Sequence, residues 1–153
     1  MSQLNLLIQK LSAQSKNTLE NAASICLQHQ HYNIELEHWL LAVIRNEKEK
    51  ASIIALLQTA NVDMETLKKD LTRALEKHHR GNKQSPAISA TVISLIKHAW
   101  STASIEFNHN EISNFDMFLT LLTHTTLSQL TAAISNCFTK LDAEKVKQKI
   151  VQI

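Results

Sequence analysis

Apolar residues recur along most of this chain at steps of three and four positions, a spacing that places them on one face of an α-helix. The first stripe of this kind consists of Leu4, Leu7, Ile8 and Leu11. Similar stripes run through residues 19–27, 39–44, 53–57 and 67–75, and further helical patterns cover about 89–107, 115–122, 129–137 and 142–153. The pattern therefore predicts a succession of amphipathic helices.

Residues 78–87 form the clearest interruption of this helical pattern. They contain the only glycine and the only proline of the chain, Gly81 and Pro86, on either side of a polar run. Such residues mark loops because glycine tolerates positive φ and proline lacks the amide hydrogen that a helix uses. Ser89 follows the break and is expected to cap the next helix, as Asp63 is expected to cap an earlier one.

The helical patterns on the two sides of this break correspond to each other. The matching positions are Ala22 and Ala99 at an offset of 77, Ile34 and Ile112 at an offset of 78, and Asp63 and Asp142 at an offset of 79. A drift of one residue per connection is typical of a duplicated helical unit whose loops vary in length. We therefore expect a single domain over residues 1–153, with one repeat at about 4–77, a linker at 78–88 and a second repeat at about 89–153.

The composition favours the same fold class. Glycine and proline occur once each and aromatic residues make up 5% of the chain, so tight turns and sheet-forming runs are scarce. Hydrophobic residues at 44% and charged residues at 20% are ordinary for a globular domain that buries its own core. The expected architecture is all-α, with two pseudo-twofold related repeats of four helices and about eight helices in total.

Charge, cysteine placement and the first residues exclude several classes of function. The formal net charge is +2, and no run of lysine and arginine alternates with aromatic residues, so neither nucleic acid nor a membrane is an expected partner. Cys26 and Cys137 lie within apolar helical patterns, which predicts two buried, reduced thiols. The first residues lack the features of a secretory signal, and no apolar run has the length of a membrane span. A cytoplasmic location is therefore expected.

The eight histidines form no recognisable metal-binding motif. Neither HExxH nor a set of cysteines and histidines with zinc spacing is present in the sequence. His29 and His31 are two positions apart, so on a helix they would not share a face, and the adjacent His78 and His79 would point apart. We expect surface or capping histidines, with His38 packing or capping at a helix start, and no bound metal.

Residues suited to catalysis are also placed unfavourably. A single glycine is incompatible with a glycine-rich phosphate loop, so no cofactor is expected in this chain. Two carboxylate pairs, Glu35 with Glu37 and Glu47 with Glu49, fall in polar segments where solvation should keep their pKa values ordinary. Cys26 lies on an apolar stripe and is expected in the core rather than at a reactive site. No catalytic residue is predicted.

Two segments resemble the repeated unit of Clp N-terminal domains. Residues 34–41, Ile-Glu-Leu-Glu-His-Trp-Leu-Leu, are similar to the isoleucine, short loop and His-Leu-Leu helix start of that family. Residues 112–119 form a second copy without the histidine, and the resemblance covers about residues 4–151. Within the family the chain is most similar to the ClpV group of type VI secretion, through EHWLL at 37–41, DLTRAL at 70–75 and the glycine and proline linker at 81–89.

The resemblance implies a module that binds a substrate protein and passes it to the ATPase rings of a hexameric AAA+ unfoldase, where ATP and Mg²⁺ would bind. In the ClpV group the substrate is an amino-terminal helix of the larger subunit of the contracted sheath, which is disassembled for reuse. The implied partner is a sheath-subunit helix in a bacterial cytoplasm, bound by a domain that is a monomer in isolation. The alternatives are an N-domain of another Clp chaperone, protease-linked or disaggregase, and a free-standing helical scaffold.

An amphipathic helix as ligand would require an apolar groove with a few polar groups that fix its register. The first apolar stripe either lines such a groove or covers the core, and Ser12 either caps a helix or, by the resemblance, borders the groove. The second-repeat loop is expected to expose His109, Ile112 and Phe115. Disaggregase N-domains carry acidic residues at positions that match His109 and Phe115, so their absence here favours a more apolar groove. The candidate peptide-binding residues are Leu4, Leu7, Ile8, Leu11, Ser12, His109, Ile112 and Phe115.

Overall fold

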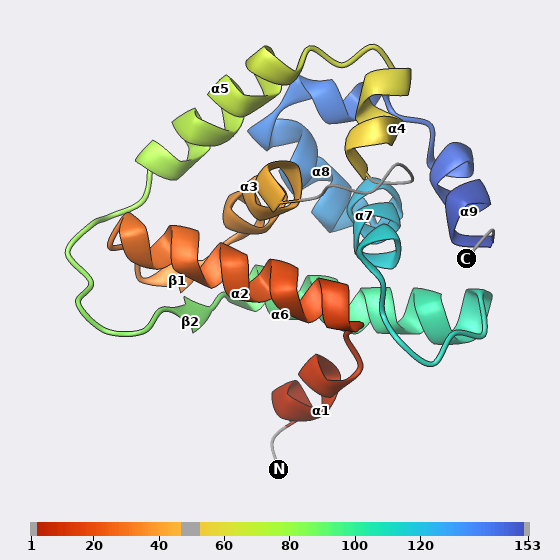
Figure 1. Cartoon of the computed structure of the whole chain (residues 1–153), viewed down its shortest axis with the longest axis horizontal. Coiled ribbons are helices and arrows are strands. Elements are labelled where there is room, and N and C mark those ends of the chain that lie inside the picture. Colours follow the sequence, from red (N-terminus) through yellow and green to blue (C-terminus); the bar gives the residue numbers. More distant parts are fainter. Residues whose placement is uncertain (1–2, 47–52, 152–153) are drawn as a thin grey trace.

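The polypeptide is a succession of helices arranged around a shared core (Figure 1). The computed structural model describes residues 3–46 and 53–151 of the 153 in the chain. The α-helices in these ranges are α1 (Gln3–Gln9), α2 (Ala13–Gln28), α3 (Leu36–Asn46), α4 (Ile53–Thr59), α5 (Met64–Glu76), α6 (Ala90–Ser101), α7 (Asn114–Thr123), α8 (Thr125–Ile134) and α9 (Ala143–Val151). The other elements are the strands β1 (Asn33–Ile34) and β2 (Ala87–Ile88), the π-helix η1 (Thr102–Glu106) and the 3₁₀-helix η2 (Asn136–Lys140). In this described part of the chain, no helix combines the length and apolarity needed to cross a membrane.

Side-chain caps begin the helices that open each half of the molecule. Ser12 Oγ accepts a hydrogen bond from Ser15 N at 3.1 Å and thereby caps α2. Ser89 Oγ accepts from Val92 N at 3.1 Å and caps α6 in the same way, as predicted. Each hydroxyl satisfies an amide that the first helical turn leaves without a backbone partner. The predicted cap of α5 by Asp63 is also confirmed.

Two short parallel pairings connect the halves crosswise. Strand β1 pairs with β2, with Ile34 opposite Ile88. The second pairing joins Leu11, directly before α2, to Ile112, which precedes α7. The segment that leads into each half is thus bound to a loop of the other half. Neither pairing was predicted, because strands of one or two residues leave no alternating pattern in a sequence.

The order of the elements repeats across the linker. Helices α2, α3, α4 and α5 correspond in order to α6, α7, α8 and α9, and α1 precedes the first set. The division into repeats at about 4–77 and 89–153 stays a prediction, and the order of the elements is compatible with it. Because each repeat supplies a pairing partner to the other, the two are interlocked rather than joined end to end.

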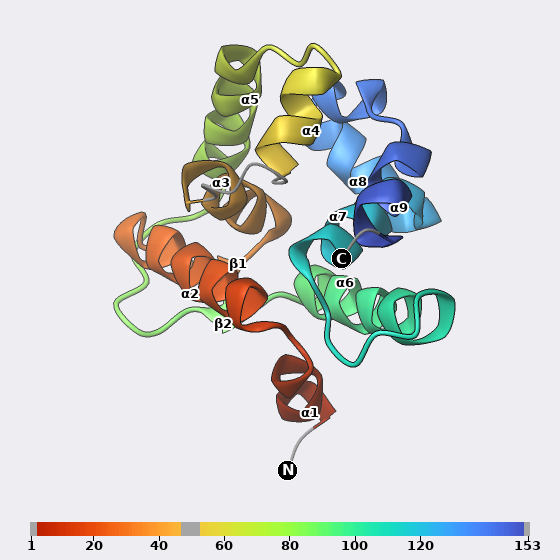
Figure 2. The same ribbon diagram turned by 45° about the vertical axis from the view of Figure 1, so that its right-hand side comes forward.

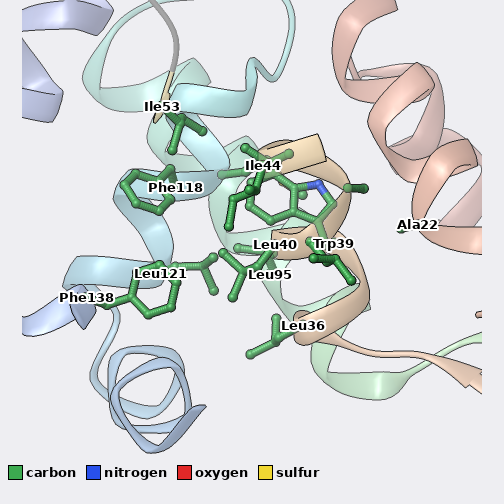
Figure 3. Close-up of a cluster of buried hydrophobic side chains, with 14 of the residues drawn as sticks. Ala22, Leu36, Trp39, Leu40, Ile44, Ile53, Leu95, Phe118, Leu121 and Phe138 are labelled. Atoms are coloured by element: carbon green, nitrogen blue, oxygen red, sulfur yellow. The ribbon is translucent and has the colours of Figure 1, made fainter. Parts of the chain in front are cut away.

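Large apolar side chains from both repeats fill the centre of the molecule (Figure 3). Trp39 of α3, Leu95 of α6 and Phe118 of α7 are all fully buried. Phe118 also meets Phe138 of η2 edge to face, with ring centroids 6.2 Å apart. Burial of such side chains is the dominant favourable contribution to folding. The all-α fold class is confirmed, and its core draws on both repeats.

The buried face of α2 differs from the predicted one. It runs through Ser15, Thr18, Ala22 and Ile25, whereas Leu27, which was assigned to the inward stripe, has 51% of its surface exposed. Serine and threonine at the start of this face obscure its apolar period. The inward side of α2 is therefore more polar than the leucine positions suggested.

Two helical patterns of the second repeat are divided in the structure. The pattern expected over 89–107 is α-helical only as far as the end of α6, and it continues as the wider π-helix η1. The pattern expected over 129–137 divides into the end of α8 and the 3₁₀-helix η2. Changes of helix type do not alter the apolar spacing enough to be visible in a sequence. π-Helical turns are frequent near functional sites, and η1 leads into the loop before α7.

Candidate functional site

Helix α1 lies at the edge of the molecule beside α6 (Figure 1, Figure 2). None of its residues is buried, and Leu4, Leu7 and Ile8 are half-buried. Leu7 and Ile8 pack against the core from outside, while Leu6 has 52% of its surface exposed. A stripe that served only as core would be covered completely. Helix α1 instead presents part of its apolar stripe to solvent, so it is suited to form one wall of a groove.

Contacts on either side of Leu11 fix the end of α1 to the second repeat. The Nζ atom of Lys10 lies 5.0 Å from the centroid of the Trp100 ring on α6, within range of a cation–π interaction. Ile112 N donates to Lys10 O at 2.8 Å, and Ser12 N donates to Ile112 O at 2.9 Å. The position of α1 is therefore set by α6 and by the loop before α7.

Leu11 and Ile112 are buried at the point where these segments pair. Their exposed fractions are 2% and 0%. The expectation that Ile112 would be exposed in its loop is wrong, because the backbone pairing draws this loop onto the body of the molecule. Both side chains are placed to support the surface from beneath, and neither offers area of its own to a ligand.

A hollow of about 340 Å³ opens where α2 begins. Its lining includes Ser12 and Ser113, which cap α2 and α7, together with Asn108 and His109. Two of the predicted site residues, Ser12 and His109, are thus brought together from different repeats. Phe115, another predicted site residue, does not line this hollow and is half-buried against the core. The residues that line this hollow are of polar types, and Ser12 among them follows the apolar α1 in the chain.

The π-helix η1 and a left-handed residue shape the loop that carries His109. His109 N donates to Ala103 O at 2.8 Å, and Asn108 has a φ of 54°. Asparagine tolerates positive φ better than most residues because its short side chain can bond locally. The rings of Phe107 and His109 stack with centroids 5.9 Å apart. The same segment exposes 81% of Ile105, an apolar side chain that the sequence analysis did not single out.

A buried polar network joins α2 to α7 close to the cap of α2. Ser15 Oγ donates to Asn114 Oδ1 at 2.8 Å, and Asn114 Nδ2 donates to Thr18 Oγ1 at 3.0 Å. Buried polar groups without such partners would destabilise the fold, so the three side chains fix the relative position of the two helices. Sequence reasoning missed this network because Ser15 and Asn114 are separated by 99 positions. The inward serine and threonine of α2 were the only available signal.

The carboxylate of Asp116 is buried at the start of α7. Ser113 N donates to Asp116 Oδ2 at 2.9 Å and Asp116 N donates to Ser113 Oγ at 3.1 Å, which together form a capping box. Burial raises the pKa of Asp116, and the bonds from Ser113 and the positive field of His109 counteract part of this rise. Asp116 therefore organises the loop beside the hollow from within.

The described residues show neither a metal-holding group nor an activated thiol. Within residues 3–46 and 53–151, no three histidine, cysteine, aspartate or glutamate side chains form a group able to hold a metal ion. Both cysteines are buried, as predicted. Burial, followed by the charge of Glu35, raises the pKa of Cys26 to about 11, and its thiol donates to Asn33 O at 3.2 Å. A protonated, hydrogen-bonded thiol is a poor nucleophile.

Several histidines differ from their predicted placement. His31 is buried rather than at the surface, whereas His38 is buried at the start of α3, in keeping with the packing or capping role expected for it. The rings of His29 and His31 were expected on different faces, yet they stack with centroids 5.4 Å apart. The reason is that α2 ends at this point and Gln30 has a φ of 56°, so the chain reverses between the two rings.

A second hollow, of about 310 Å³, lies between α3, α5 and α8. Glu37 lines it and was expected to be solvated, but its side chain is only 13% exposed and burial raises its pKa. The other predicted carboxylate pair, Glu47 and Glu49, lies outside the described residues. Ser135 Oγ donates to Asp70 Oδ2 at 2.7 Å and joins α5 to the end of α8. The lining of this hollow is mixed, with apolar side chains such as Leu36, Leu130 and Ile134 beside the charged groups, and it is distinct from the hollow at Ser12.

Solved structures with the same arrangement of helices include N-domains of ClpV. The N-domain of ClpV from Vibrio cholerae is 28% identical to this chain, with a TM-score of 0.80 over 99% of this chain and 90% of that one. A complex of a ClpV N-domain with a VipB peptide is also 28% identical, with a TM-score of 0.76 over 99% of this chain and 92% of that one.

Sequence comparison agrees with the structural likeness. The chain is 22% identical over 140 residues to the AAA+ ATPase ClpV1 of Pseudomonas aeruginosa. This similarity covers 92% of the present chain, which spans only 15% of the length of ClpV1. The family model described as the Clp repeat (R) N-terminal domain matches residues 10–148, which is most of the chain. The chain therefore belongs to the Clp repeat (R) N-terminal domain family.

Proposed function

We propose that this chain is the substrate-recognition N-domain of a ClpV-like AAA+ unfoldase. Its ligand is an amphipathic helix from the amino terminus of a contracted type VI secretion sheath subunit, which is recognised so that the sheath can be disassembled and reused. The observation that carries the proposal is the 28% identical ClpV N-domain solved with a VipB peptide, which covers 99% of this chain. The partly exposed apolar stripe of α1 supports it independently.

The bound helix contacts α1 and the loop before α7. Leu4, Leu7 and Ile8 provide the apolar wall, because their side chains are half-buried and retain surface that a ligand can cover. Ser12 and His109, which line the hollow at the start of α2, provide polar groups that fix the register of the ligand. The ligand therefore meets an apolar wall and a polar end.

Three further residues of the predicted site act from behind this surface. Leu11 and Ile112 are buried and hold α1 to the loop through their backbone pairing. Phe115 is half-buried and packs against the core. Their contribution to binding is to keep the wall and the hollow in a fixed relation, so that less order has to be imposed when the ligand docks.

The energetics of such a site predict modest affinity for a single domain. Apolar burial contributes roughly 25 cal/mol per Å² of covered surface, but much of this is offset by the cost of ordering a flexible peptide. Six copies on a hexameric ring raise the effective affinity, because the first bound helix holds the others near their sites. ATP and Mg²⁺ bind in the AAA+ regions of the full-length protein, in the bacterial cytoplasm, and neither nucleic acid nor a membrane takes part.

Isothermal titration of the domain with a synthetic amino-terminal helix of the cognate sheath subunit tests the proposal. We expect saturable binding in the micromolar range, lost when the apolar face of the peptide is made polar. Absence of binding by a folded domain would contradict the proposal. That outcome would favour an N-domain of another Clp chaperone, protease-linked or disaggregase.

A further inference from the structure

Four histidine rings form a cluster where α2 ends, α3 begins and the chain leaves α5. The ring centroid of His31 lies 5.4 Å from that of His29, 5.2 Å from that of His38 and 5.4 Å from that of His78. The centroids of His38 and His78 are 5.7 Å apart. These four residues are called the histidine cluster below. They include none of the residues assigned to the proposed peptide site.

Hydrogen bonds hold two of these rings in the neutral form. Glu35 N donates to His38 Nδ1 at 2.8 Å, so this nitrogen must keep its lone pair. The neutral His38 ring then carries its hydrogen on Nε2, which donates to His31 Nδ1 at 2.9 Å. His31 in turn carries its hydrogen on Nε2, a buried atom that finds no hydrogen-bond partner among the described residues. A proton added to either ring would have to displace a donor that already points at the same nitrogen.

The environment of the cluster also disfavours positive charge. Burial, followed by the charges of Arg80 and Arg45, lowers the pKa of His29. Burial and then the neighbouring histidines lower the pKa of His38 from its ordinary 6.5 to about 3. The pKa of His31 is lowered by burial first and by the nearby histidines and Arg80 next. The closed arrangement therefore excludes protons near neutral pH.

Two carboxylates and a thiol complete the surroundings of the cluster. Among the described residues, Glu37 is the acid whose side chain pairs with a ring of the cluster. Its Oε1 atom lies 3.5 Å from His78 Nε2. Glu35 contributes its backbone amide to His38, and Cys26 Sγ donates to His31 O at 3.6 Å. Because burial raises the pKa of Glu37, its negative charge is itself lost as the medium is acidified. The cluster thus loses its compensating charge when protons enter.

The linker between the repeats is attached to the segment that carries His31. Asn82 N donates to Gln30 O at 2.9 Å, and Asn82 Nδ2 donates to His31 O at 3.0 Å. Ala87 N donates to Tyr32 O at 3.1 Å, just before strand β2 pairs with β1. Displacement of His31 would therefore loosen the attachment of the linker directly.

We propose that the histidine cluster is a proton-operated latch for the inter-repeat linker. While the rings of His31 and His38 are neutral, His78 at the start of the linker packs on both of them, and the linker lies along β1. When His31 and His38 take up protons, like charges on rings 5.2 Å apart repel, and the donor to His38 is displaced. The linker and β2 then separate from the first repeat, while the pairing of Leu11 with Ile112 remains.

Proton linkage sets the expected size of this effect. A histidine with an ordinary pKa of 6.5 that binds a proton only in the open form favours opening by about thirtyfold between pH 7.5 and pH 5. His31 and His38 meet this condition, because both accept a donor in the closed form. Titration of either one is sufficient for an effect of this size.

Amide hydrogen exchange of the intact chain, followed by NMR and corrected for intrinsic rates, tests the latch. The reporting amides are Asn82, Ala87 and Ser89, and the reference amides are Ser12 and Ile112 in the other parallel pairing. Protection of the reporting amides should fall at least about thirtyfold from pH 7.5 to pH 5, with the reference amides unchanged. An equal fall at both pairings, or no fall at the linker, overturns the proposal.

A pair of double variants separates the cluster from general acid sensitivity. In His31→Gln/His38→Gln, the amide side chains can accept from Glu35 N and donate to each other without titrating. In this variant, protection of the linker amides should fall by less than about threefold between pH 7.5 and pH 5. The matched control is His98→Gln/His124→Gln, which removes another close pair of rings, with centroids 4.2 Å apart. In this control the linker amides should lose protection at pH 5 as fully as in the unmodified chain.

The outcome of these variants is decisive in either direction. A full acid response in a folded His31→Gln/His38→Gln variant overturns the latch, because the opening then needs neither ring. If that variant does not fold, the comparison of the two pairings in the unmodified chain still decides the question, since only one of them adjoins the histidine cluster.

Discussion

His38 and Asp116 occupy matching positions in the two repeats and perform the same local task with different chemistry. Each accepts a hydrogen bond from the backbone amide three residues earlier, Glu35 N to His38 Nδ1 at 2.8 Å and Ser113 N to Asp116 Oδ2 at 2.9 Å. The structure thus agrees with the expected capping role of His38. An aspartate accepts such a bond in its charged form, whereas a histidine must be neutral to do so. The first repeat is therefore the acid-sensitive one.

The free energy of unfolding should fall as the pH is lowered from 7.5 to 5. In the folded chain the pKa of His38 lies at about 3, and burial also lowers the pKa values of His29 and His31 from 6.5. Below pH 6.5 the unfolded chain therefore binds more protons than the folded chain, which favours unfolding. Burial raises the pKa of Asp116 above its ordinary 3.8, so at this residue the folded chain binds the proton more readily than the unfolded chain. Asp116 therefore opposes part of the loss of stability on acidification. Urea denaturation at several pH values measures the change, and a constant value from pH 7.5 to 5 would contradict the expectation.

At the scale of the elements, Ser12 and Ser89 form a matched pair that separates two possible roles of Ser12. Replacing either serine by alanine removes an N-cap and should lower the free energy of unfolding by about 1 kcal/mol. Only Ser12 lines the hollow beside α1, so Ser12→Ala should also weaken binding of the sheath helix. Urea denaturation and isothermal titration of both variants distinguish the effects. Equal losses of binding would show that affinity follows stability rather than contact with Ser12.

The apolar stripe that begins in α1 has two parts with different roles. Leu11 is 2% exposed, so Leu11→Ala should lower the free energy of unfolding by roughly 2–5 kcal/mol through the cavity it leaves. Ile8 is half-buried, and Ile8→Asp should weaken peptide binding by at least about tenfold, because docking would desolvate the new charge. Urea denaturation followed by circular dichroism measures the free energy of unfolding of Leu11→Ala. Isothermal titration measures the peptide affinity of Ile8→Asp, and its circular dichroism spectrum reports whether it is folded. Loss of helical signal in Ile8→Asp would mean that this part of the stripe is core.

At the scale of the whole molecule, the crossed pairings make each repeat depend on the other. Leu11 needs Ile112 as its backbone partner, and β1 needs β2, although the members of each pair belong to different halves. The central core likewise mixes Trp39 of the first half with Phe118 of the second (Figure 3). Separation of the halves would expose apolar surface on both.

Fragments 1–83 and 84–153, cut in the polar part of the linker, should therefore not fold alone. Each fragment is about half as long as the chain, so it would bury a smaller share of its surface than the whole chain even with a complete core. In each fragment part of the core is also missing. Circular dichroism during urea denaturation should show no cooperative transition for either fragment. A cooperative transition in one isolated fragment would show that this half is an autonomous unit.

The sequence by itself determined the helical class, most helix positions, the caps at Asp63 and Ser89 and the likeness between the halves. These features depend on residues three or four positions apart, whose side chains meet within one or two turns of the same helix. The amphipathic character of α1 was readable for the same reason. Whether its stripe faces the core or solvent was not, because that depends on what else packs beside the helix.

Only the tertiary structure decided which residues surround the candidate site. Ile112 lies in a polar loop sequence, yet its pairing with Leu11 removes it from solvent. Ser12 and His109 line one hollow although they come from different repeats. His29 and His31 converge because the chain reverses at the end of α2, and the linker then returns along β1 to complete the histidine cluster. Contacts between such distant segments depend on how the whole set of helices packs, and local preferences along the chain do not specify them.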